Sequence, residues 1–85
     1  MTFKDIIKLI NKYNISASCL GSHEMGNDGF EIYKNNNGKY EVYYFERYEK
    51  SFLSICDTEK EACKAFVNLI KNYEPEFYKE AVKYF

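Results

Sequence analysis

The 85-residue sequence contains few of the residues that catalytic and metal-binding proteins need. It has one histidine, His23, one proline, Pro75, and no tryptophan. Its four glycines form neither a GxGxxG fingerprint nor a P-loop, so no phosphate-binding cradle is predicted. No histidine lies near a serine or cysteine in a signature of nucleophilic catalysis. We therefore expect a protein that is not an enzyme and has no cofactor.

Cysteine is also scarce, and its three positions contain no CxxC pair. An odd number of cysteines, with an apolar N-terminal run that Lys8 interrupts, predicts a reducing, cytoplasmic environment. A metal site made of Cys19, Cys56 and His23 is conceivable, but structural zinc needs four ligands at close spacing. Buried thiols and a solvated histidine are the expected arrangement, with no metal bound.

Long apolar runs and an excess of charge are absent as well. No segment approaches the roughly 18 to 20 apolar residues of a membrane span, so no membrane partner is expected. The net charge is −1, which gives no electrostatic reason to expect a nucleic-acid partner. Residues 15–56 nevertheless lean acidic through Glu24, Asp28, Glu31, Glu41, Glu46 and Glu49.

Large apolar side chains are abundant. Hydrophobic residues make up 46% of the chain and aromatic residues 19%, which is enough for a small core without disulfides. Because 85 residues leave room for one small domain, residues 1–85 are predicted to form a single domain.

Three segments show helical patterns. Thr2 and Asp5 predict a capping box before an apolar stripe at helical spacing. Thr58 and Glu61 predict a second capping box and helix, and Pro75 suits the first turn of a terminal helix. Between the first two helices, alternating apolar residues and turn signals predict four strands, at residues 15–20, 30–34, 39–47 and 51–56.

These elements predict an α+β fold. We expect a two-layer sandwich in the order α-β-β-β-β-α-α, in which an antiparallel four-stranded sheet carries helices on one face. The asparagine-rich tract at residues 35–38 predicts the hairpin between the second and third strands.

The third strand, within GKYEVYYFER, has aromatic residues on both faces. Its period of two places Tyr40, Val42 and Tyr44 on one face, which we assign to the core, and Glu41, Tyr43 and Phe45 on the other. An outward Tyr43 and Phe45, beside Phe52 or Leu53 of the next strand, predicts a small apolar patch ringed by carboxylates, typical of a protein contact. Cross-strand stabilisation of a thin sheet, or cover by the terminal helix, would explain the same pattern.

Two segments, GKYEVYYFER and SFLSICDTEKEACKAFVNLI, resemble small bacterial immunity proteins of polymorphic toxin and contact-dependent inhibition systems, over residues 30–70. Where that family has a glycine after the arginine, this chain has Tyr48. The resemblance implies a cytoplasmic protein that binds a cognate toxin domain, commonly a nuclease, and blocks it. The predicted partner-binding residues are Glu24, Asp28, Glu41, Tyr43, Phe45 and Glu46.

Two other functions stay open at the level of sequence. A helix, strands and a helix also resemble a double-stranded-RNA-binding module, in which lysines would carry the contact. Against it, Glu41 and Glu46 interrupt the aromatic strand and would repel phosphate. A homodimeric adaptor joined through the sheet face is the other alternative, so the chain is expected to be a monomer or a weak homodimer.

Overall fold

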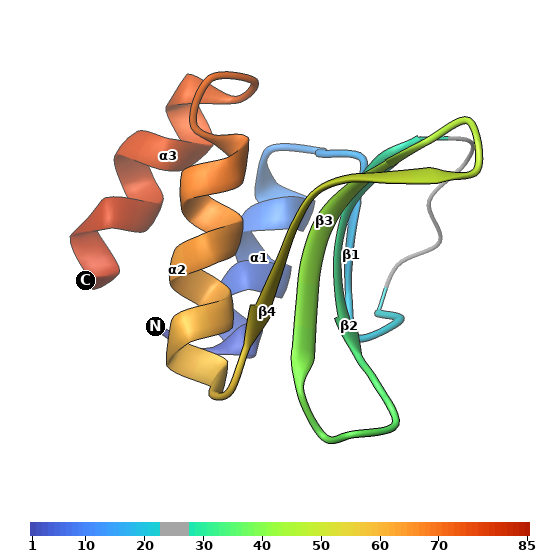
Figure 1. The fold of residues 1–85 in the computed structure, drawn as a ribbon. Coiled ribbons are helices and arrows are strands. Elements are labelled where there is room, and N and C mark those ends of the chain that lie inside the picture. The colour runs from blue at the N-terminus through green and yellow to red at the C-terminus, as the bar shows by residue number, and fades with distance from the viewer. Residues whose placement is uncertain (23–27) are drawn as a thin grey trace.

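The computed structural model describes residues 1–22 and 28–85. They form an α+β fold of one four-stranded sheet and three α-helices with a short 3-10 helix at the end (Figure 1). In chain order the elements are α1 (Phe3–Lys12), β1 (Ala17–Cys19), β2 (Gly29–Lys34), β3 (Tyr40–Glu46), β4 (Glu49–Cys56), α2 (Glu59–Ile70), α3 (Pro75–Ala81) and η1 (Val82–Tyr84). The order therefore differs from the predicted one by the added 3-10 helix.

The helices begin where the sequence places their caps. The Thr2 hydroxyl accepts a hydrogen bond from the Asp5 N–H, and the Asp5 carboxylate accepts one from the Thr2 N–H at 2.9 Å, which confirms the first capping box. At α2 the Thr58 hydroxyl accepts from the Glu61 N–H at 3.1 Å, one of the two bonds predicted there. Pro75 opens α3, where its missing N–H would have had no intrahelical partner.

The sheet is mixed, and the prediction of a fully antiparallel sheet is wrong. Its strand order is β1-β2-β3-β4, with antiparallel pairing of β2 with β3 and of β3 with β4. Strand β1 instead runs parallel to β2, with Ala17 opposite Phe30 and Cys19 opposite Ile32. Because β1 has only three residues, the chain must travel back roughly 10 Å before β2 begins.

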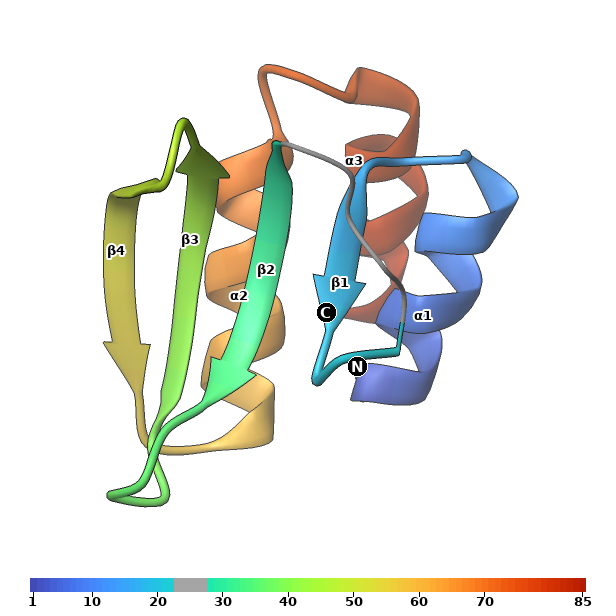
Figure 2. The same ribbon diagram turned by 90° about the vertical axis from the view of Figure 1, so that its right-hand side faces the viewer.

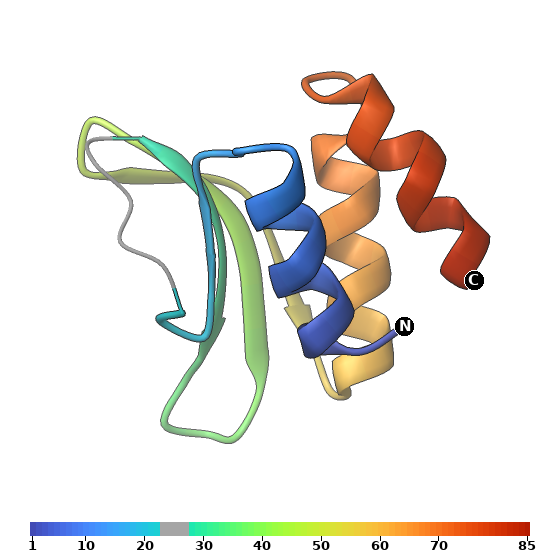
Figure 3. The ribbon, with the colours of Figure 1, turned by 180° about the vertical axis from the view of Figure 1, so that it is seen from behind.

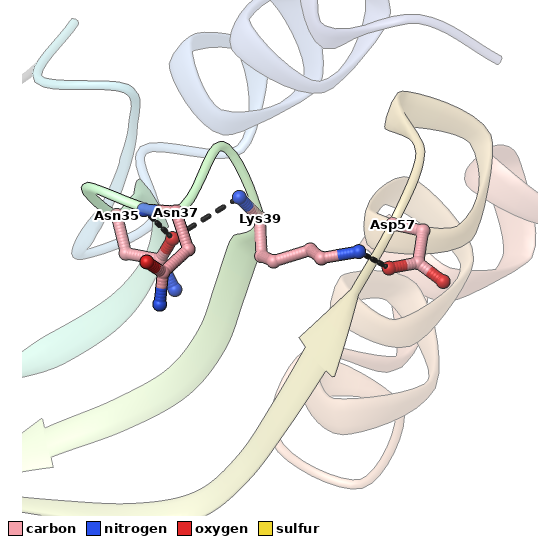
Figure 4. A network of polar contacts seen from close by, with 4 residues as sticks. All are labelled: Asn35, Asn37, Lys39 and Asp57. Carbon is pink, nitrogen blue, oxygen red and sulfur yellow. Dashed lines mark hydrogen bonds and ion pairs between the residues drawn. The ribbon is translucent and has the colours of Figure 1, made fainter.

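The predicted turn between β2 and β3 is present at residues 35–38. The Asn35 side-chain carbonyl accepts hydrogen bonds from the N–H groups of Asn37, at 2.9 Å, and Lys39, at 3.0 Å (Figure 4). Gly38 has a φ of +75°, in the region that glycine adopts without steric cost. The Lys39 ammonium pairs with Asp57, which joins the turn to the segment just before α2.

One face of the sheet packs against the helices and forms the core. Val42 is fully buried there, with Tyr40 and Tyr44 packed against the same core, which confirms the inward assignment of these three residues. Phe30 and Tyr44 lie with ring centroids 4.9 Å apart, and Tyr73, just after α2, stacks on Tyr44. Aromatic contacts therefore link β2, β3 and the end of α2.

All three helices lie on the same side of the sheet (Figures 1 and 3). Helices α1 and α2 pack directly on the strands, whereas α3 packs on α1 and α2 farther from the sheet. The terminal helix thus does not cover the other face of the sheet. None of the helices in residues 1–22 and 28–85 is long and apolar enough to cross a membrane.

Candidate protein-binding surface

The face of the sheet that points away from the helices is the candidate site, and we call it the outer face (Figure 2). Its members alternate with the core residues along β2, β3 and β4. Strand pairing sets Glu31 opposite Tyr43, Glu41 between Tyr33 and Ile55, and Phe45 opposite Lys50. No helix of the described residues covers this face.

A polar network occupies the centre of the outer face. The Glu41 carboxylate accepts hydrogen bonds from the Asn35 amide and from the Lys50 ammonium, each at 3.0 Å. These two bonds, that of Asn35 first, hold the pKa of Glu41 below its usual range. Lys50 Nζ also lies 4.7 Å from the ring centroid of Tyr43, a cation–π contact. Lys50 is therefore held in one place by two side chains of β3.

Tyr43 extends this network to β2. Its hydroxyl donates a hydrogen bond of 2.7 Å to Glu31 Oε2. Burial raises the pKa of Tyr43, and the bond to Glu31 raises it further because the carboxylate favours the protonated phenol. The residues Asn35, Glu41, Lys50, Tyr43 and Glu31 thus form one connected arrangement across three strands, which we call the outer network.

Exposed apolar side chains flank the outer network. Tyr33 is 44% exposed, Leu53 48% and Ile55 63%, and all three belong to the strands of this face. Leu20, at the end of β1, is also exposed and lines a shallow pocket of about 320 Å³ with Glu31 and Tyr33. A partner protein can bury these large apolar groups without having to order the polar side chains at their centre, because those side chains are already fixed.

The structure changes the role of Tyr43. The sequence predicts it as an exposed anchor, but Tyr43 is only 5% exposed and is wedged between Glu31 and Lys50. A side chain that is already buried has little area left to give to a partner. The aromatic residue therefore holds the outer face together, and the large exposed contacts come from its neighbours.

The other predicted binding residues separate into two groups. Glu41 belongs to the outer network, and Phe45 is half-buried opposite Lys50. Glu46 is exposed at the end of β3, and Asp28 lies near the same end, where its carboxylate accepts a hydrogen bond of 3.4 Å from the Arg47 N–H. Glu24 lies outside the described residues.

A β-bulge decides which residues of β4 reach the outer face. Val42 pairs with Ser54 but Tyr44 pairs with Ser51, so Phe52 and Leu53 both lie opposite Tyr43. Phe52 has a φ of +58° and lines a shallow pocket of about 250 Å³ with Leu69 and Tyr73. The sequence suggests Phe52 or Leu53 as the neighbour of Tyr43. Leu53 lies on the outer face, whereas Phe52 turns toward α2.

Sequence reasoning missed Tyr33 and Ile55. Both follow from the strand register, since each lies opposite Glu41 on the outer face. The turn at residues 35–38 would have been a sufficient signal for Tyr33, because it fixes the pairing of β2 with β3. Ile55 has no such local signal, because the bulge shifts its partner by one residue.

The cysteines contribute to the core instead. Cys19, Cys56 and Cys63 are free and buried, and burial raises the pKa of both the Cys19 and the Cys63 thiol to about 12. Among residues 1–22 and 28–85, no three His, Cys, Asp or Glu side chains form a group that could hold a metal ion.

Comparison with known proteins returns no relative for this chain. No protein-family model, no curated protein and no solved structure matches it.

Proposed function

We propose that this chain binds a partner protein through the outer face, and that the partner is a cognate bacterial toxin domain, which the chain neutralises as an immunity protein. The observation that carries the proposal is the open face itself, where Tyr33, Leu53 and Ile55 surround the outer network. The resemblance of residues 30–70 to immunity proteins supports the choice of partner.

The energetics of the outer face suit stoichiometric binding. Fully burying one large apolar side chain contributes about 1.5–3 kcal/mol, and Tyr33, Leu53 and Ile55 each have roughly half of that area still exposed. Because Lys50 and Glu41 already hold each other, few side chains lose rotamer freedom on association. A rigid face with exposed apolar groups favours tight binding over weak encounters.

Charge supports a basic partner such as a nuclease domain. Glu31 and Glu41 lie within the outer face, and Asp28, Glu46 and Glu49 lie near one end of it. Carboxylates around an apolar patch attract a basic surface and raise the rate of association. Blocking that surface would keep a nuclease from its substrate.

Coexpression with the product of the neighbouring gene, as the candidate toxin, tests the proposal. The chain is produced with the toxin domain, and complex formation, affinity and growth of the producing cells are measured. Tyr33→Ala with Ile55→Ala is expected to weaken the complex by roughly 10- to 100-fold and to reduce protection. The matched control is Tyr84→Ala with Phe85→Ala, two exposed aromatic residues on the helical side.

Failure of the unaltered chain to bind the toxin domain or to protect the cells would contradict the proposal. Equal affinity in the outer-face and control variants would place the contact elsewhere. Binding of double-stranded RNA by the same preparation, with a steep loss of affinity on adding salt, would favour the RNA-binding alternative instead.

A further inference from the structure

The turn of the β3–β4 hairpin consists of exposed residues in an unfavourable backbone conformation. Glu46 and Glu49 pair directly across the strands, so the loop between them consists of Arg47 and Tyr48 alone. Both loop residues have positive φ, +49° for Arg47 and +65° for Tyr48, a conformation in which such turns favour asparagine and glycine. Tyr48 is 95% exposed.

A pair of like charges further lowers the stability of this end of the hairpin. Glu46 and Glu49 face each other, and directly opposed carboxylates destabilise a strand pair. Asp28 adds a third carboxylate, which accepts a hydrogen bond from the Arg47 N–H. Tyr48 is almost fully exposed, so its ring gains almost no burial in the isolated chain, and the carboxylates beside it repel each other.

The hairpin end can enlarge a contact made by the outer face. The four strands, three to eight residues long and spaced about 4.8 Å apart, span roughly 380 Å² in projection. A stable interface buries about 800 Å² of accessible surface on each partner, so an exposed segment next to the strands adds area that such an interface can use. The hairpin end continues this face directly, because the Glu46–Glu49 pair adjoins the pairing of Phe45 with Lys50.

We infer that the β3–β4 hairpin end forms the second half of the binding surface, with Tyr48 as an anchor in an apolar slot of a basic partner protein. The inference rests on the proposed function and names the part of the contact that sets specificity. Tyr48 supplies a large rigid side chain, and Glu46 and Glu49 face cationic groups of the partner. Association relieves the repulsion between the two carboxylates, because the partner's cations lie beside them.

Substitutions that stabilise the hairpin end distinguish an effect on binding from an effect on folding. Tyr48→Asn replaces the aromatic ring with a residue that tolerates positive φ, and Glu46→Lys turns the repelling pair into an attracting one. Both variants are expected to raise Tm by roughly 2–6 °C. Both are also expected to weaken the complex with the candidate toxin, in inactivated form, by at least about 10-fold.

Matched controls isolate the side chains from general effects. Tyr48→Phe keeps the ring and is expected to keep the affinity within about 3-fold. Glu76→Lys, on α3, makes the same charge change away from the sheet and is expected to leave binding unchanged at 0.15 M salt. Calorimetry measures both affinity and Tm for each variant.

The outcomes distinguish this inference from the proposed function. Higher Tm with lower affinity for Tyr48→Asn and Glu46→Lys supports it. Unchanged affinity in both variants, while the unaltered chain binds, overturns the role of the hairpin end and leaves the proposed function standing. No complex with the unaltered chain overturns both.

Discussion

The Tyr43 hydroxyl donates a hydrogen bond of 2.7 Å to Glu31 across the pair of strands β2 and β3. Tyr43 is thus buried on a sheet face that carries no described helix, because its own neighbours cover it: Glu31 on one side and the Lys50 ammonium over its ring. The bond predicts how the stability of the sheet depends on this tyrosine and on pH.

Replacing Tyr43 with phenylalanine should lower the free energy of unfolding by about 1 kcal/mol, because one hydrogen bond is lost while the ring remains. Denaturant unfolding measures the change. Glu31→Gln keeps an acceptor and should cost less. A Tyr43→Phe variant as stable as the unaltered chain would show that the bond contributes nothing in solution.

Alkaline titration should reveal Tyr43 as a late-ionising tyrosine. Its pKa is raised in the folded state, so the stability it contributes is full below the ordinary tyrosine pKa of about 10 and is lost as pH rises above that value. Absorbance at 295 nm should show a component that ionises after the exposed tyrosines and is absent in Tyr43→Phe. Identical titration curves for the two proteins would contradict this expectation.

The pKa of Glu41 should depend on Asn35. The amide of Asn35 and the ammonium of Lys50 lower this pKa, so the stability that Glu41 contributes is present above the ordinary glutamate pKa and lost as pH falls through the lower folded value. Asn35→Ala should move the pKa of Glu41 back toward its ordinary value, as followed by carboxyl NMR. Asn36→Ala, in the same turn, serves as the control and should leave the titration of Glu41 unchanged.

Removal of the Thr58 hydroxyl should weaken α2. Thr58→Ala leaves the Glu61 N–H without its acceptor and should cost about 1 kcal/mol, or roughly 4–8 °C in Tm for a domain of this size. Thr58→Ser keeps the acceptor and should retain most of the stability. Equal Tm values for the alanine and serine variants would rule out a contribution from the cap.

The three thiols should be protected while the chain is folded. Cys19, Cys56 and Cys63 are buried, and the pKa of each is raised by burial, so little reactive thiolate forms at pH 8. A thiol reagent should label them at the rate of unfolding and label all three rapidly in denaturant. Fast labelling of the folded chain would contradict the buried positions.

The candidate site was only partly accessible to sequence reasoning. Alternation along residues 39–47 correctly separates Tyr40, Val42 and Tyr44 from the outer residues. It cannot tell that outward Tyr43 is buried, because the cover comes from Glu31 and Lys50 on the two neighbouring strands. The exposure of a residue on a sheet depends on cross-strand neighbours, which only the register supplies.

The sequence by itself determined the features that depend on a few adjacent residues: the caps of α1 and α2, Pro75 at the start of α3, the turn at residues 35–38 and the α+β class. Tertiary structure alone decided the parallel direction of β1, the bulge opposite Tyr43 and the side of the sheet on which α3 packs. Caps and turns are settled by hydrogen bonds within about four residues. Strand direction and helix placement depend on contacts between residues far apart in the chain, where many local sequences fit equally well.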